Sequence, residues 1–181
     1  MYAVFVAGSR ALSKLNVHVK ERLENIVRQN FTVLVGDANG ADKAVQRYLA
    51  DRDYQHVIVY CMDICRNNIG NWPTHAHTAS SSLRRDRQYY GIKDAAMAKD
   101  ASCGFMIWDG TSKGTFTNVI NLVNARKKVL LYSSPKKHFF TLRTLGDLNR
   151  ALNANGIKNA AAFLASLGTN SPESEHLPFA L

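Results

Sequence analysis

Three glycine-containing turns hold the side chains that are best suited to bind a phosphorylated ligand. They lie at residues 7–10, 36–42 and 108–115, and each follows a short apolar run. Glycine lets the backbone approach a ligand closely, and free N–H groups at a helix start bind phosphate. We therefore expect a ligand site built from these turns and one later helix. Its expected residues are Gly8, Ser9, Arg10, Gly36, Asp37, Asn39, Gly40, Asp42, Arg87, Asp109, Gly110, Ser112, Lys113, Gly114 and Thr115.

Each turn also has a purely structural explanation. Ser9 and Asp42 are residue types that cap helices, although Asp42 could instead accept a hydrogen bond from a ribose hydroxyl. The third turn concentrates Gly, Thr, Ser and Lys at a helix start, which suits a sugar phosphate, but it lacks the spacing of a P-loop. Gly8 does not open a GxGxxG fingerprint either. The signal is therefore the shared position of the three turns, each directly after a strand.

Carboxylates in the same turns raise the alternative of catalysis. Cleavage of an N-glycosidic bond needs a carboxylate that activates water or forms a glycosyl intermediate. Asp109 and Asp37 are the candidate catalytic residues, and Asp42 and Asp94 also lie near expected strand ends. Because an Asp in a glycine-rich turn is more often a turn former or a cap, binding without turnover is the main interpretation.

A helix expected at residues 83–99 brings further groups to the site. Arg87 or Lys93 could reach a phosphate, and Tyr89 or Tyr90 could stack on a base. The structural alternative is a helix with an apolar core face and a solvated basic face.

Cysteine and histidine are too sparse to indicate a metal site. The C-x3-C spacing of Cys61 and Cys65 and the H-x-H spacing of His75 and His77 are not those of a standard zinc finger. Three cysteines are an odd number, which argues against a disulfide framework. We expect neither a metal nor a cofactor.

The order of the expected elements indicates the fold that positions these turns. Strands are expected at 2–7, 31–35, 56–61, 103–108 and 128–132, and helices at 15–29, 41–51, 83–99 and 115–125. Continuous apolar strands separated by helices predict a parallel sheet covered on both faces. The fold class is therefore α/β, a Rossmann-like three-layer α/β/α arrangement with a mostly parallel sheet of about five strands. Residues 67–82 are expected to be irregular.

The chain divides into three expected parts. Residues 1–135 form the Rossmann-like nucleotide-binding domain. Residues 136–168 form a small extension packed on the same domain, with an added edge strand at 138–144 and helices at 145–154 and 159–167. Residues 169–181 contain two prolines and mixed polarity, and we expect a flexible tail.

The composition is typical of a globular domain, and basic residues are concentrated in one region of the chain. The 181 residues are 46% hydrophobic and 20% charged, with a formal net charge of +9. Residues 126–158 contain eight Lys or Arg against the single acid Asp147, which could serve an anionic ligand, nucleic acid or solubility. No apolar run reaches the roughly 18–20 residues of a membrane span, and the first residues are typical of a strand, not of a signal peptide. We expect a cytoplasmic protein with no membrane partner.

The three turns, in this order, resemble the SLOG superfamily. The motifs are Ala7-Gly8-Ser9-Arg10, then residues 36–42, then Met106 to Thr115, and the resemblance covers roughly residues 2–133. It is strongest to the YspA/YpsA-related branch of small bacterial and phage proteins, with LOG phosphoribohydrolases and the DNA-processing protein DprA as distant members. The resemblance implies a Rossmann-like domain that binds nucleotide-derived ligands in defence or stress contexts, and a homodimer or higher homo-oligomer.

Two departures from the family pattern bear on function. Asp37 and Asn39 stand where the family has Gly and Arg, which makes the second turn less suited to phosphate. Asn118 stands where LOG enzymes have a catalytic Glu, and Asn cannot act as a general base, which argues against LOG-type hydrolysis.

Three functions follow in order of preference. The first is binding of a nucleotide or nucleotide-derived ligand, ADP-ribose-like or a nucleoside phosphate, by a sensor or sequestering protein. The second is N-glycosidic chemistry on a nucleoside or nucleotide, as a hydrolase or a deoxyribosyltransferase-like enzyme. The third is DprA-like binding of nucleic acid, which the basic region favours and the lack of a known nucleic-acid motif opposes.

Overall fold

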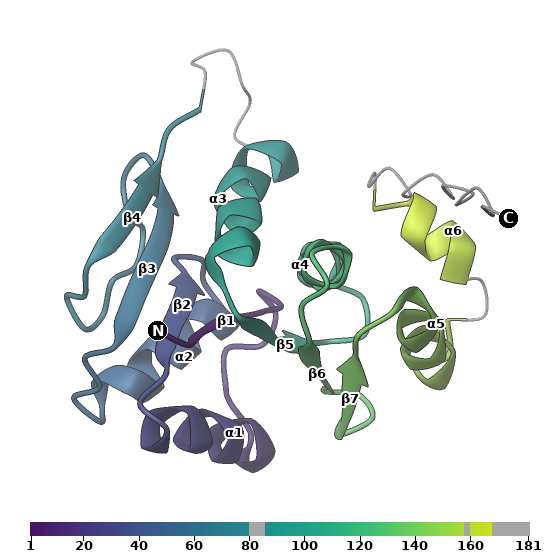
Figure 1. Cartoon of the computed structure of the whole chain (residues 1–181), viewed down its shortest axis with the longest axis horizontal. Coiled ribbons are helices and arrows are strands. Elements are labelled where there is room, and N and C mark those ends of the chain that lie inside the picture. The colour runs from purple at the N-terminus through teal and green to yellow at the C-terminus, as the bar shows by residue number, and fades with distance from the viewer. Residues whose placement is uncertain (80–85, 158–159, 168–181) are drawn as a thin grey trace, which may run out of the picture.

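The computed structural model describes residues 1–79, 86–157 and 160–167. They form one seven-stranded sheet with helices on both faces (Figure 1). The strands are β1 (Ala3–Gly8), β2 (Thr32–Gly36), β3 (Val57–Met62), β4 (Thr74–His77), β5 (Cys103–Trp108), β6 (Val129–Ser133) and β7 (His138–Leu142). The helices are α1 (Val17–Arg28), α2 (Ala41–Ala50), α3 (Arg87–Asp100), α4 (Lys113–Asn124), α5 (Leu145–Ala154) and α6 (Ala160–Ala165).

The strands lie in the order β4-β3-β2-β1-β5-β6-β7, and every neighbouring pair is parallel except β6 and β7. The chain leaves β1 in one direction to build β2, β3 and β4, and returns to the other side of β1 to build β5. This reversal makes the carboxyl ends of β1 and β5 the topological switch point. In open α/β sheets, ligands bind in the crevice at this point. The topology thus confirms the Rossmann-like α/β class predicted from the sequence.

Two apolar cores explain why the central strands are apolar without interruption. Successive side chains of a strand point to opposite faces of the sheet. Accordingly, Val4 and Val6 of β1 pack with α1 and α2, whereas Phe5 packs in the core that includes side chains of α3 and α4. Figure 1 shows α1 and α2 on one face of the sheet and α3 and α4 on the other. Both faces of β1 are therefore removed from water, as expected for a parallel sheet.

Two strands extend the sheet beyond the five that the apolar runs predict. The strand β7 lies within the edge strand expected at residues 138–144. The strand β4 forms inside the stretch expected to be irregular, and its Thr74, His75 and Ala76 are exposed. Because an edge strand of exposed, largely polar residues carries no apolar run, periodicity does not reveal it.

The predicted start of the helix before β5 is wrong. The helix α3 begins at Arg87, not at residue 83, because the Asp86 carboxylate accepts hydrogen bonds from the N–H groups of Gln88 and Tyr89 and caps the helix. Residues 80–85 lie outside the described part of the chain.

The extension after residue 135 packs on the same core. A capping box between Thr144 and Asp147 starts α5, and Leu148 and Leu152 of α5 are buried in the core that contains Leu131 of β6. The tail expected at residues 169–181 lies outside the described residues. Within the described ranges, no helix is long and apolar enough to cross a membrane.

Candidate ligand-binding site

A pocket of about 480 Å³ opens at the carboxyl ends of β1 and β5, at the switch point. Its size is within the ordinary range of small-molecule sites. It is bounded by the turns after β1, β2 and β5, by the loop after β3 and by α3. Its lining residues are Ala7, Gly8, Arg10, Ala11, Ala38, Asp42, Arg66, Asp86, Tyr90, Lys93, Asp94, Met97, Asp109, Ser112, Gly114, Thr115 and Asn118.

The turn after β1 forms the floor of the pocket. Gly8 lies so close to its neighbours that a Cβ atom would stand 2.6 Å from both the Ala41 Cβ and the Ile107 carbonyl oxygen. Ser9 is buried behind this floor, and its Oγ accepts a hydrogen bond from the Asp109 N–H at 3.1 Å. Ser9 does not cap α1, because Asn16 has that role. Ser9 therefore joins the turns after β1 and β5 and does not itself line the pocket.

Two arginines and a tyrosine lie together on the pocket wall. The guanidinium carbons of Arg66 and Arg10 lie 4.4 Å and 5.4 Å from the centre of the Tyr90 ring. The backbone of Gly40 packs against the backbone of Arg10. The φ angle of Gly40 is +83°, and a Cβ at this position would lie 2.2 Å from the Arg10 carbonyl oxygen. The wall thus presents an aromatic face and two permanent cations to the pocket.

The turn after β5 ends at the start of α4. The Asp109 Oδ1 accepts hydrogen bonds from the N–H groups of Thr111 at 2.9 Å and Ser112 at 2.7 Å. Burial raises the pKa of Asp109, but these hydrogen bonds outweigh burial and hold the pKa below its usual value. The next two N–H groups, of Lys113 and Gly114, have no hydrogen-bond partner within the described residues. They are free donors at a helix N-terminus, where anions bind.

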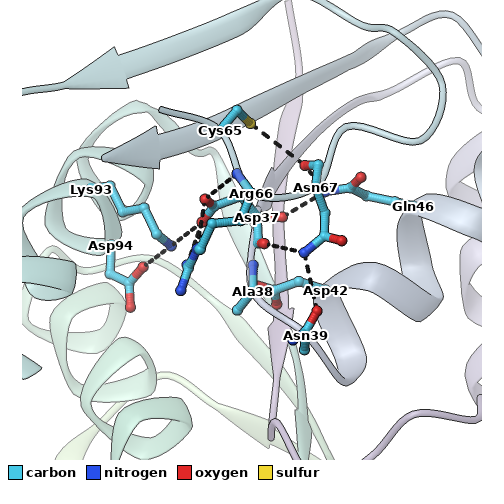
Figure 2. Close-up of polar contacts among 11 residues, drawn as sticks. Asp37, Ala38, Asn39, Asp42, Gln46, Cys65, Arg66, Asn67, Lys93 and Asp94 are labelled. Carbon is cyan, nitrogen blue, oxygen red and sulfur yellow. Dashed lines mark hydrogen bonds and ion pairs between the residues drawn. The ribbon is translucent and has the colours of Figure 1, made fainter. Parts of the chain in front are cut away.

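Asp37 is fully buried and does not line the pocket. Its Oδ1 accepts a hydrogen bond from Arg66 Nη2 at 2.6 Å (Figure 2). Its Oδ2 accepts hydrogen bonds from Arg66 Nε at 2.9 Å and from the Arg66 backbone N–H at 3.1 Å. Burial raises the pKa of Asp37, but Arg66 and Lys93 outweigh it and the net shift is downward. Both oxygens are occupied, so the geometry assigns Asp37 to positioning Arg66.

The second turn also holds the loop after β3. The Asn67 side-chain amide donates to the Asp37 carbonyl oxygen at 2.7 Å and to the Asn39 Oδ1 at 3.2 Å. Figure 2 shows Asn39 and Asn67 on the side of this cluster away from Lys93. Asn39 thus braces the loop that carries Arg66 and lies outside the pocket lining.

Asp42 lines the pocket although it is only 6% exposed. It does not cap α2, whose N-cap residue is Gly40 without a side-chain hydrogen bond. Its Oδ2 accepts from the Ala38 N–H at 3.3 Å, while its Oδ1 has no hydrogen-bond partner in the part of the chain that the structure describes. Burial raises the pKa of Asp42 to about 6, against the opposing effect of Lys93.

Lys93 reaches the same cluster from α3 and is 3% exposed. Its Nζ lies 2.8 Å from the Asp94 Oδ1 and 3.9 Å from the Asp37 Oδ1. Burial lowers the pKa of Lys93, but the surrounding carboxylates outweigh burial and the net shift is upward, so the ammonium stays charged.

The structure brings together many of the predicted site residues. Gly8, Arg10, Asp42, Asp109, Ser112, Gly114 and Thr115 line the pocket. Ser9, Gly36, Asp37, Asn39, Gly40, Gly110 and Lys113 lie in the same turns but outside the lining. The Lys113 ammonium instead donates to the Ser166 carbonyl oxygen at 3.5 Å. Arg87 begins α3, and its side chain lies outside the described residues.

Arg66 is the main lining residue that the sequence did not indicate. It lies in the stretch expected to be irregular, where no glycine-rich turn marks a site. A basic residue four positions after the end of β3 was the available signal. Asn118, considered only for its lack of a carboxylate, also lines the pocket.

The cysteines and histidines form no metal site in the described ranges. Cys61, Cys65 and Cys103 are free thiols. Within those ranges, no group of three or more His, Cys, Asp or Glu side chains is arranged to hold a metal ion.

Comparison with known proteins bears on the fold. No protein-family model matches the chain, and no curated protein sequence matches it. The solved structure of DNA processing protein A from Helicobacter pylori, which binds single-stranded DNA, is similar with a TM-score of 0.56 at 13% sequence identity. The similarity covers 92% of this chain and 80% of that chain. It shows a shared Rossmann-like fold, and the resemblance to the SLOG superfamily stays a prediction.

Proposed function

We propose that the chain binds a nucleotide or nucleotide-derived ligand, ADP-ribose-like or a nucleoside phosphate, in the switch-point pocket, as a sensor or sequestering protein. The observation that carries this proposal is the set of groups that line the pocket. The lining of one cavity of about 480 Å³ includes Gly114 with its free N–H, cations beside an aromatic ring, and a buried carboxylate with one oxygen unpaired within the described residues. The free N–H suits a phosphate, the aromatic ring and the cations suit a base, and the carboxylate suits the hydroxyl groups of a sugar.

The start of α4 supplies the phosphate-binding group. Within the described residues, the N–H groups of Lys113 and Gly114 have no hydrogen-bond partner, and nothing lies within 4 Å of the position that a Gly114 Cβ would take. The helix dipole adds positive potential at this end. Arg10 lines the same pocket and adds an exposed cation.

The wall formed by Tyr90 supplies a surface for the base. Aromatic side chains stack on nucleobases, and arginine guanidinium planes do the same. Tyr90 is only partly buried, and it has both Arg10 and Arg66 beside it. A base entering the pocket can therefore stack on the ring or on a guanidinium.

The charge of the pocket favours a small ligand over a long polyanion. Three cations, Arg10, Arg66 and Lys93, line it together with the carboxylates of Asp42, Asp86, Asp94 and Asp109. A continuous electropositive groove is typical of sites that bind a nucleic-acid backbone. The carboxylates here suit hydrogen-bond donors such as hydroxyl and amino groups.

Thermal-shift and calorimetric titrations with ADP-ribose, NAD and AMP test the proposal. A ligand present at 100 times its Kd stabilises the folded chain by roughly 2.7 kcal/mol. Arg10→Ala removes an exposed side chain of the lining and should weaken binding. Arg150→Ala, a charge-matched change on α5 away from the pocket lining, should leave binding unchanged. Absence of binding by all three compounds would contradict the proposal.

Single-stranded DNA is a second candidate ligand. The similarity to a protein that binds single-stranded DNA, together with the basic region 126–158, supports it. Titration of a fluorescent oligo-dT at several salt concentrations tests this function, because contacts with phosphates make affinity fall steeply with salt. An oligonucleotide affinity that is absent or insensitive to salt would argue against it.

A further inference from the structure

We propose that the ligand carries a ribose with free vicinal hydroxyl groups, and that Asp42 accepts their hydrogen bonds. The site then selects ribosyl 5′-phosphate compounds over their deoxyribosyl counterparts. This inference rests on the function proposed above and assigns the sugar that the pocket recognises.

The position of Asp42 is the first support. It lines the pocket, its side chain is almost fully buried, and its Oδ1 lacks a hydrogen-bond partner in the described residues. A buried carboxylate oxygen without a partner is destabilising, and buried polar groups in folded proteins are nearly always satisfied. Because Asp42 lines the pocket, a ligand that binds against this side chain would supply the missing donor.

The neighbouring charges are the second support. Arg66 binds Asp37 through two hydrogen bonds of its side chain, and Lys93 binds Asp94 at 2.8 Å (Figure 2). Within the described residues, Asp42 forms no ion pair, although Lys93 lies close enough to oppose the rise of its pKa. The nearby ammonium and guanidinium groups would repel a cationic ligand group, so neutral hydroxyl donors fit Asp42 better than an amine.

The chemistry of a ribose matches this acceptor. Vicinal hydroxyl groups provide two donors on one side of the ring, and an ionised carboxylate has acceptor sites on both oxygens. A deoxyribose that lost one hydroxyl would leave the buried oxygen unpaired in the complex. A missing hydrogen bond to a charged group lowers affinity roughly 10- to 100-fold.

The acceptor role also makes affinity depend on pH. Asp42 faces Lys93 and Asp94 of α3, Asp37 of its own turn and Arg66 of the loop after β3. Because its pKa is about 6, Asp42 is largely protonated at pH 5 and then has fewer acceptor sites for the diol. The preference for the ribosyl compound over its deoxy counterpart should therefore fall between pH 7.5 and pH 5.

Calorimetric titration of the full chain with AMP, 2′-deoxy-AMP and 3′-deoxy-AMP tests this inference. At pH 7.5 the native chain should bind AMP roughly 10- to 100-fold more tightly than either deoxy compound. Asp42→Asn should lose most of this preference, and the ratio of AMP to 2′-deoxy-AMP affinity should no longer change toward pH 5, because the phosphates of the two compounds titrate alike. Circular dichroism of each variant checks that it is folded.

Asp51→Asn is the matched control. It removes the same charge from an exposed position at the other end of α2, outside the pocket lining. This variant should keep the preference for ribose and its pH dependence.

Binding of all three nucleotides with equal affinity would overturn the ribose assignment and leave the proposed function intact. A preference for AMP that survives Asp42→Asn would overturn the role of Asp42. Failure of AMP, ADP-ribose and NAD to bind the folded native chain would overturn both the proposed function and this inference.

Discussion

The guanidinium of Arg66 donates to both carboxylate oxygens of the buried Asp37, at 2.6 Å and 2.9 Å. This pair joins the turn after β2 to the loop after β3. It places one cation in the pocket lining beside Tyr90 and keeps its counter-ion outside that lining. The presence of Asp at position 37 is therefore explained by Arg66, 29 residues later in the chain.

Arg66→Ala should lower the free energy of unfolding by about 3 kcal/mol, because it leaves a buried carboxylate with little compensation. This is the lower end of the usual range for a broken buried pair, since the Arg66 side chain is 35% exposed. Urea denaturation at pH 7.5 measures the change. Arg150→Ala, which breaks an ion pair at a side chain that is 77% exposed, should cost less than about 1 kcal/mol. Equal effects of the two substitutions would contradict the structural role of the Arg66–Asp37 pair.

Asp42→Asn should stabilise the folded chain at pH 7.5. The pKa of Asp42 is raised in the folded state from its usual 3.8 to about 6. Its contribution to stability is therefore fully present below pH 3.8 and is lost as the pH rises through 6. Removal of the ionisable group should raise the free energy of unfolding by up to about 3 kcal/mol at pH 7.5, with little change at pH 4.

Urea denaturation of the native chain and of Asp42→Asn at pH 4, 5, 6 and 7.5 measures this difference. The pKa of Asp37 shifts in the opposite direction, because it is lowered in the folded state. The contribution of Asp37 to the free energy of unfolding is therefore lost as the pH falls below 3.8. Both proteins share that loss, so it cancels in the comparison. A difference between them that does not grow between pH 4 and 7.5 would contradict the assigned pKa of Asp42.

The sequence was sufficient to predict the central strands because both faces of each are buried. Val33, Leu34 and Val35 of β2, for example, form an uninterrupted apolar run for that reason. The same reasoning could not detect β4, whose Thr74 and His75 face solvent at the edge of the sheet. Nor did it place the start of α3, since the cap at Asp86 competes with other polar residues nearby.

The sequence could predict the site residues whose position depends on their neighbours in the chain. It could not predict the roles that depend on a residue far along the chain. Gly8 ends β1, and Ser112 and Gly114 come within six residues of the end of β5, so their position in one crevice follows from the parallel sheet. The roles of Asp37 and Asp42 depend on Arg66 and Lys93, which come from a later loop and helix. Periodicity and turn chemistry are local, and they carry no information on which carboxylate a distant cation binds.

Tyr90→Ala should weaken nucleotide binding roughly 5- to 100-fold, because base–aromatic stacking contributes about 1–3 kcal/mol. Tyr90→Phe keeps the ring and should keep affinity within a few fold. Calorimetric titration with AMP at pH 7.5 measures both. A loss in the Phe variant as large as in the Ala variant would show that the hydroxyl, and not the ring face, contacts the ligand.

Two Gly→Ala substitutions should separate folding from binding. Gly40 has φ of +83°, and its added Cβ would lie 2.2 Å from the Arg10 carbonyl oxygen, so Gly40→Ala should lower the free energy of unfolding by more than about 1 kcal/mol. Gly114 lies in the first turn of α4 with nothing within 4 Å of its added Cβ. Because Ala favours helix over Gly, Gly114→Ala should leave stability unchanged or raise it by up to about 1 kcal/mol.

The same Gly114→Ala substitution should weaken binding of AMP, since the new methyl group occupies space beside the free N–H groups at the start of α4. Thermal denaturation and calorimetric titration of one preparation measure both properties. A variant that is as stable as the native chain but binds AMP more weakly supports a phosphate site at this helix end. Unchanged affinity in the stable Gly114→Ala variant would instead place the phosphate elsewhere in the pocket, with Arg10 as the next group to substitute.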